Sequence, residues 1–100
     1  MLVRTQVNNA AQLFAKPVAQ CTAEDFSRCM ATNLESCFHL CQLAHPLLLN
    51  ASLAGGGSIV NVSSIGSLLA YHDLALYGTA KGMLLYIFFK FTRHFRYSDF

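Results

Sequence analysis

Residues 54–63 have the sequence AGGGSIVNVS, which predicts the boundary between a helix and a strand. Its glycines at 55–57 break the helical pattern before them, because glycine loses more backbone freedom in a helix than any other residue. The segment 58–63 is short, β-branched and flanked by turn residues, which is typical of a strand. Residues 1–9 are too short for periodicity to decide, but we expect a strand to end near Val7-Asn8-Asn9.

A long helix is predicted between these two strands, from about residue 23 to residue 49. Thr22 is suited to cap its N-terminus, and Asp25 stands at the capping-box spacing from Thr22. We expect Pro46 to kink or end the helix, and Pro17 to keep residues 10–21 in a loop. Apolar residues at steps of three and four predict a core-facing stripe, made up of Phe26, Met30, Leu34, Phe38 and Cys41.

Residues 64–75 are predicted to form a loop, and a last helix begins near Leu76 and enters the aromatic C-terminal segment. The order strand, long helix, strand, helix implies an α/β fold whose parallel strands are joined by a right-handed crossover. The 100 residues are enough for about one small domain. Two strands and two helices should leave both sheet edges unpaired and one sheet face largely uncovered, so we expect the isolated chain to fold poorly or to associate.

The composition excludes two classes of protein. Apolar residues make up 54% of the chain and charged residues 12%, so the chain has the apolar mass to collapse and is not a disordered tail. The second excluded class is a transmembrane protein. The longest uninterrupted apolar run, 83–89, has seven residues, whereas a helix that spans a membrane needs about 20. The N-terminus, MLVRTQ, does not resemble a signal peptide, so we expect a cytoplasmic protein with four reduced cysteines.

Three residues point to carbonyl chemistry. Tyr77 and Lys81 share one face of the last predicted helix, and Ser64 precedes Tyr77 by thirteen residues. A free tyrosine has a pKa of about 10, and a nearby ammonium lowers it, so such a tyrosine can donate a proton to a ketone or accept one from an alcohol. A serine hydroxyl aimed at the same oxygen stabilises developing charge. No side chain delivers hydride, so this chemistry requires a nicotinamide cofactor.

Five stretches of the sequence resemble the short-chain dehydrogenase/reductase family and, within it, the plant tropinone reductase-like group. They are VNNAA (7–11), TAEDFSRCMATNLES (22–36), FHLCQLAHPLL (38–48), GGGSIVNVSS (55–64) and YGTAKG (77–82). The resemblance covers residues 7–82 and leaves 83–100 as a divergent tail. It implies that residues 1–100 form a single partial NAD(P)-binding domain, with part of a Rossmann-like, doubly wound parallel sheet.

The resemblance also implies catalytic roles for four residues. Tyr77 is the acid/base, Lys81 lowers the pKa of Tyr77, and Ser64 orients the substrate carbonyl. Asn33 holds a water in the proton relay behind Lys81. Ser63 competes with Ser64 for the serine role, and the thirteen-residue spacing favours Ser64.

The cofactor-binding residues implied by the resemblance are Asn9, Ala10, Tyr77 and Lys81. Ala11 departs from the family's Asn-Asn-Ala-Gly, so a methyl group is added near a tight turn beside the cofactor. The family's phosphate-binding turn, Gly-x-x-x-Gly-x-Gly, is absent from this sequence. The likeness to tropinone reductases favours NADP, with NAD as the alternative.

Two functions follow as hypotheses. The first is an NAD(P)-dependent oxidoreductase that interconverts a small-molecule ketone and a secondary alcohol, represented here by a truncated middle portion. The second is a catalytically inactive fragment that associates with itself or with full-length relatives, because the two long helices form the subunit interface in the family. A chain with no function is the remaining alternative.

Other patterns are discounted. Cys37, Cys41 and His45 recur every four residues, but one helix rarely encloses a metal ion, so we expect no metal and cysteines that pack in the core. Glycosylation sequons occur at Asn50 and Asn61, but we expect neither to be used because the sequence shows no export signal. The basic, aromatic tail is predicted to bind neither nucleic acid nor membrane, and residues 84–89 are predicted to be prone to aggregation.

Overall fold

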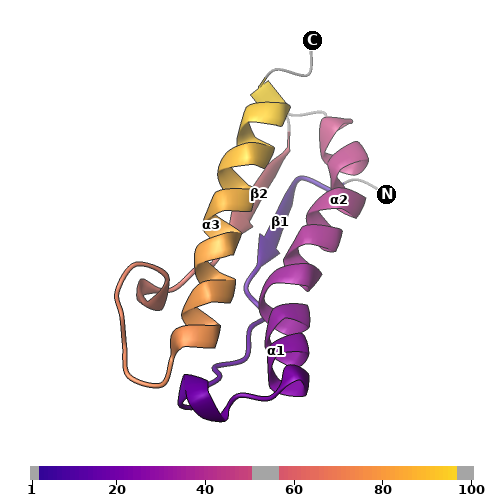
Figure 1. Ribbon diagram of the computed structural model, residues 1–100. Coiled ribbons are helices and arrows are strands. Elements are labelled where there is room, and N and C mark those ends of the chain that lie inside the picture. The colour runs from indigo at the N-terminus through magenta and orange to yellow at the C-terminus, as the bar shows by residue number, and fades with distance from the viewer. Residues whose placement is uncertain (1–2, 51–56, 97–100) are drawn as a thin grey trace.

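The computed structural model describes residues 3–50 and 57–96, with side chains as far as residue 87. Its main elements are β1 (Thr5–Asn8), α1 (Ala23–Met30), α2 (Ser36–Leu49), β2 (Ser58–Asn61) and α3 (Ala75–Arg96) (Figure 1). Shorter ones are the 3₁₀ turn η1 (Val18–Gln20), the π-helical segment η2 (Ala31–Glu35) and the 3₁₀ turn η3 (Ile65–Ser67). The predicted order of strand, long helix, strand and helix is confirmed.

The two strands form a parallel sheet in which Asn8 lies opposite Asn61. Parallel strands need a long crossover connection, and α1, η2 and α2 supply it (Figure 1). Val7 and Val60, which pair with each other, are 58% and 47% exposed. The α/β fold with a parallel sheet is therefore confirmed, and within the described residues one face of the sheet is left uncovered, as expected.

A polar cluster joins the strands beneath α2. The Asn8 side-chain amide donates to Asn61 Oδ1 at 2.6 Å and to Cys41 Sγ at 3.3 Å, and Gln6 Nε2 donates to Asn8 Oδ1 at 2.7 Å. Slipping the strands by one residue would turn these amides to the opposite face and break the cluster. A buried amide without a partner costs about 1–3 kcal/mol, so the cluster holds the strand register.

The helix predicted over 23–49 is present with those bounds, interrupted by the π-helical segment η2 that the sequence pattern did not predict. Pro46 lies inside α2 and does not end it, because the helix continues to Leu49. The Asn50 side chain donates to the Pro46 carbonyl at 2.9 Å and satisfies one carbonyl of the last turn. Pro46 thus lies in the last turn of the helix, with three helical residues after it.

The predicted apolar stripe of this helix is only partly the buried one. Phe26 and Phe38 are exposed, whereas Cys29, Asn33 and Cys37 are buried. Small and polar side chains on the buried face allow the helix to lie close to α3 and the sheet. The periodicity of the large apolar residues therefore predicted a face next to the buried one. The buried residues 29, 33 and 37 each come one position before the predicted residues 30, 34 and 38.

The chain enters β2 through a close contact with α2. A Cβ on Gly57 would lie 2.9 Å or less from three atoms of Leu48, and the Gly57 amide donates to the Leu48 carbonyl at 3.2 Å. Glycine is therefore required at 57, for packing against α2. Gly55 and Gly56 of the same run, and the sequon serine at 52, lie outside the described residues.

The strand predicted over 58–63 is shorter than expected, since β2 ends at Asn61. The Val62 amide still donates to the Asn8 carbonyl at 3.0 Å, and the chain leaves the sheet after it, where the Ser63 hydroxyl donates to the Lys81 carbonyl at 3.2 Å. The last helix begins at Ala75, one residue before the predicted start, and its backbone is helical through Arg96. Side chains beyond residue 87, which include the last two of the predicted aggregation-prone segment 84–89 and those of the basic tail, lie outside the described residues.

The core lies where α1 meets α3. Cys29, Leu76 and Ala80 are buried together, and the partly buried side chains of Phe14, Cys21, Met30 and Leu34 pack against them. The small side chains of Cys29 and Ala80 allow the two helices to approach closely. This contact places the N-terminal part of α3 against α1.

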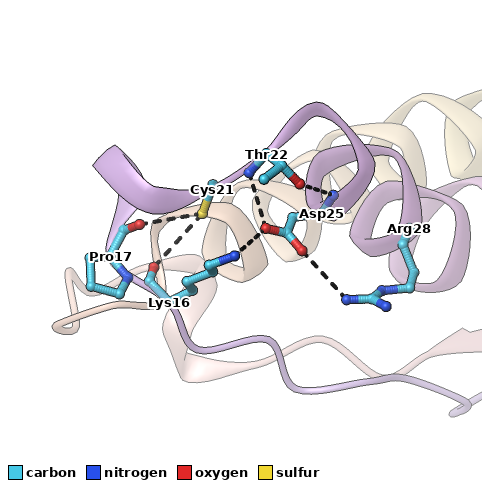
Figure 2. Close-up of polar contacts among 6 residues, drawn as sticks. All are labelled: Lys16, Pro17, Cys21, Thr22, Asp25 and Arg28. Carbon is cyan, nitrogen blue, oxygen red and sulfur yellow. Dashed lines mark hydrogen bonds and ion pairs between the residues drawn. The ribbon is translucent and has the colours of Figure 1, made fainter.

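Asp25 organises the N-terminus of α1 (Figure 2). Its Oδ2 accepts from the Thr22 amide at 3.0 Å, and its own amide donates to Thr22 Oγ1 at 3.1 Å, which confirms the predicted capping box. Oδ2 also accepts from Lys16 Nζ at 2.6 Å, and Oδ1 lies 3.5 Å from the Arg28 guanidinium. The Lys16 bond, followed by the Thr22 amide, lowers the pKa of Asp25 from 3.8 to about 2.

Replacing Asp25 tests this network. A carboxyl whose pKa is lower in the folded than in the unfolded chain stabilises the fold above its ordinary pKa, and this contribution is lost as the pH falls towards 2. We expect stability to decline between about pH 5 and pH 2, and Asp25→Asn to be less stable at pH 7 with a shallower decline. Thermal melts followed by circular dichroism measure both curves, and parallel curves would contradict the pKa assignment.

Candidate active site

The carboxyl ends of the two strands meet at one edge of the sheet. Asn9 and Ala10 follow β1 and are exposed, and Ser63 and Ser64 come shortly after β2. Ligands of open parallel α/β sheets bind outside the carboxyl ends of the strands. The predicted cofactor-binding residues Asn9 and Ala10 therefore lie at the edge where a ligand is expected.

Lys81 ties α3 to the end of β2. Its side chain is almost fully buried, at 2% exposed, and Nζ donates to the Val62 carbonyl at 3.0 Å. Nζ also lies 5.9 Å from the centre of the Tyr77 ring, one helical turn earlier. A buried ammonium is costly unless it has partners, so the Val62 carbonyl and the Tyr77 ring are what keep this charge in place.

Ser64 lies beside the same tyrosine ring. A methyl group placed on Gly66 would lie 3.5 Å from Ser64 Oγ and 3.9 Å from two carbons of the Tyr77 ring, so both residues border one point in space. Ser64 Oγ accepts from the Gly66 amide at 3.1 Å, which fixes its side chain. The structure thus brings Ser64, Tyr77 and Lys81 together, while the Ser63 hydroxyl faces the Lys81 carbonyl.

Asn33 is fully buried in the π-helical segment η2, at 0% exposed. Its Oδ1 accepts from the Gln12 amide at 2.9 Å, and Nδ2 donates to the carbonyls of Gln12 and Cys29 at 3.0 Å each. The side chain therefore holds the segment after β1 against the long helix. This is a different contact from the water-binding role that the family resemblance implies, which stays a prediction.

Two features of the site could not be found by motif spacing. The acceptor for Lys81 is a backbone carbonyl, that of Val62, which any residue type would supply. Gly78 follows Tyr77, and a Cβ there would lie 2.6 Å from the Gly66 carbonyl oxygen. An isolated glycine inside a helical pattern is the only sequence signal of that close approach.

The cysteines of α1 and α2 are buried thiols. Burial is the main cause that raises the pKa of Cys29 and of Cys41, which favours the unreactive protonated form at neutral pH. Among the described residues, no group of three His, Cys, Asp or Glu side chains is placed to hold a metal ion. In the same part of the chain, no helix has the length and apolar character needed to cross a membrane.

Comparison with known proteins identifies the family. The sequence matches the short chain dehydrogenase family over residues 2–96. The chain belongs to this family. Its fold is correspondingly similar to that of the angucycline C-6 ketoreductase LanV with bound NADP, with a TM-score of 0.82 and 34% identity over 93% of this chain and 34% of that one.

Plant members of the short-chain dehydrogenase family are more similar in sequence. A tropinone reductase homolog of Arabidopsis thaliana is 51% identical over 78 residues, which are 78% of this chain and 28% of that protein. Senescence-associated protein 13 of the same plant is 50% identical over the same shares. The resemblance to tropinone reductase-like proteins is confirmed, and the chain spans about 28% of the length of these curated relatives.

Gly78→Ala separates helix propensity from packing. Glycine to alanine in a helix interior normally stabilises by about 1 kcal/mol. Here the new Cβ would lie 2.6 Å from the Gly66 carbonyl, and overpacking costs about 1–3 kcal/mol, so we expect a net loss of stability in urea melts. Gly82→Ala on the same helix is the control, because its Cβ would lie 3.6 Å from Ser67 O and should stabilise. Stabilisation by both variants would contradict the close approach.

Proposed function

We propose that this chain supplies the catalytic part of an NAD(P)-dependent oxidoreductase that interconverts a ketone and a secondary alcohol, as in tropinone reductase-like proteins. The observation that carries the proposal is the buried Lys81 ammonium, held between the Val62 carbonyl and the Tyr77 ring, with Ser64 beside that ring. A positive charge near a phenol stabilises the negative charge that develops on the phenol oxygen as it gives up its proton. This is the arrangement that a tyrosine acid/base requires.

In the direction of ketone reduction, the Tyr77 hydroxyl donates its proton to the ketone oxygen. The Ser64 hydroxyl donates a hydrogen bond to the same oxygen and stabilises the negative charge that develops there. The positive charge of Lys81 stabilises the phenolate left on Tyr77. The hydride for the carbonyl carbon would come from a reduced nicotinamide when that cofactor is bound.

The residues present fit one end of such a cofactor. An ammonium has three N–H donors, and among the described residues Lys81 gives one of them to Val62, so it retains donors for a ribose hydroxyl. Asn9 and Ala10 are exposed at the same edge of the sheet. The sequence has no glycine-rich phosphate turn, so these residues would hold the nicotinamide end alone. The NADP named for the LanV structure favours NADP over NAD for this chain.

Tyr77→Phe tests the catalytic proposal. The variant lacks the hydroxyl that moves the proton, and general acid catalysis is worth about 10²–10⁴-fold, so turnover of a cyclic ketone should fall by at least about 100-fold. Consumption of NADPH by the purified chain measures it. Tyr86→Phe removes the same hydroxyl from an exposed position on α3 and should retain activity. Full activity in Tyr77→Phe would contradict the assigned role, and an inactive parent chain would contradict catalysis by this chain.

The second candidate is association without catalysis. Phe38 on α2 and Phe26 on α1 are exposed apolar side chains, as on a helix face that packs against another subunit. We expect the chain to co-purify with a full-length tropinone reductase homolog and Phe38→Glu to lose that association. Gln20→Glu adds the same charge on η1 and should not. Equal recovery of the parent chain and both variants would contradict association through this face.

A further inference from the structure

Lys16 is held by contacts from its side chain and from its backbone. Its Nζ bonds Asp25 Oδ2 at 2.6 Å at the start of α1 (Figure 2). Its backbone amide donates to the Asp73 carbonyl at 2.8 Å, in the loop before α3. The Cys21 thiol also lies 3.9 Å from the Lys16 carbonyl. One residue therefore connects the start of α1 to the segment that leads into α3.

The Asp73 end of this connection lies just before the helix that carries Tyr77. The backbone of Asp73 has a φ of 60°, in the left-handed region, so its peptide groups point in directions that an ordinary residue would not give. The first hydrogen bond of α3 runs from the Gly78 amide to the Leu74 carbonyl at 2.7 Å. Holding the Asp73 carbonyl thus fixes the direction in which the chain enters the first turn of α3.

The Asp25 end is itself firmly anchored. The Asp25 carboxylate closes the capping box with Thr22, and its other oxygen faces Arg28. The side chain of Asp25 is 11% exposed, and that of Lys16 is 34% exposed. Because α1 also packs on α3 through Cys29 and Leu76, the start of α3 is held to α1 in two ways. One is this core contact, and the other is the pair of contacts that Lys16 makes.

We propose that Lys16 is a positioning residue for Tyr77, which it holds in place by tying the entry of α3 to the capped end of α1. The proposal rests on the function proposed above only for the catalytic role of Tyr77. The mechanical part concerns the order of the first turn of α3 and holds whether or not the chain is catalytic.

The simpler alternative is that the Lys16–Asp25 ion pair stabilises α1 alone. Partly exposed ion pairs contribute little to overall stability, so a stability measurement does not separate the two roles. Arg28 provides the comparison, since it is a second cation on the same carboxylate and has no described contact with the segment before α3. Removing Lys16 should disturb α3, and removing Arg28 should not.

The experiment compares Lys16→Met, Lys16→Arg and Arg28→Met in the full 100-residue chain by amide hydrogen exchange and by NMR of labelled tyrosine rings. Lys16→Met should speed exchange of the amides of 78–81 by about fivefold and shift the Tyr77 ring signals, with the Tyr86 ring and the amides of 40–45 in α2 unchanged. Lys16→Arg should restore the parent behaviour, and Arg28→Met should match the parent.

Two results would overturn the proposal. If Lys16→Met loosens α2 as much as the start of α3, Lys16 has only a general stabilising role. If Arg28→Met loosens the start of α3 equally, the effect belongs to the capped end of α1 and not to the contact with Asp73. Absence of NADPH turnover would count against the proposed function and leave these two measurements unaffected.

Discussion

The parallel pairing of β1 with β2 is the constraint on which the rest of the described structure depends. Strands that run the same way cannot be joined by a tight turn, so α1, η2 and α2 must carry the chain back across the sheet. The same pairing brings the carboxyl ends of both strands to one edge. The hydrogen bond between Asn8 and Asn61 holds the register, and so determines which residues meet at that edge.

Close approach of backbones is the second condition for the site. Gly78 allows the Gly66 carbonyl to lie against α3, and the small side chains of Cys29 and Ala80 allow α1 to do the same. A glycine in a helix costs about 1 kcal/mol relative to alanine, so packing outweighs helix propensity at this position. A larger residue at 78 would push the Gly66 carbonyl, and η3 with it, away from α3 and so away from Tyr77.

The polar groups buried near the site are mostly engaged in structure. Asn33 holds Gln12, Asn8 holds Asn61, and the Lys81 ammonium holds Val62. A buried polar group left unpaired is costly, so each of these contacts makes one arrangement of the chain much more stable than its neighbours. Lys81 differs from the two asparagines in retaining donors after its described contact is made. Lys81 can therefore hold the Val62 carbonyl and still donate to a cofactor in the proposed reaction.

The order of the elements, the capped start of the long helix and the spacing of Ser64, Tyr77 and Lys81 could be predicted from the amino-acid sequence alone. These features depend on residues close together in the chain: Thr22 with Asp25, the glycine run before β2, and one turn of α3. Three features came from the folded chain: which helix face is buried, where η2 interrupts the helix, and the contacts that Val62, Gln12 and Gly66 supply at the site. Those outcomes depend on contacts with backbone atoms of residues far away in the chain. Every residue type has a backbone carbonyl, so the sequence does not show which carbonyl makes such a contact.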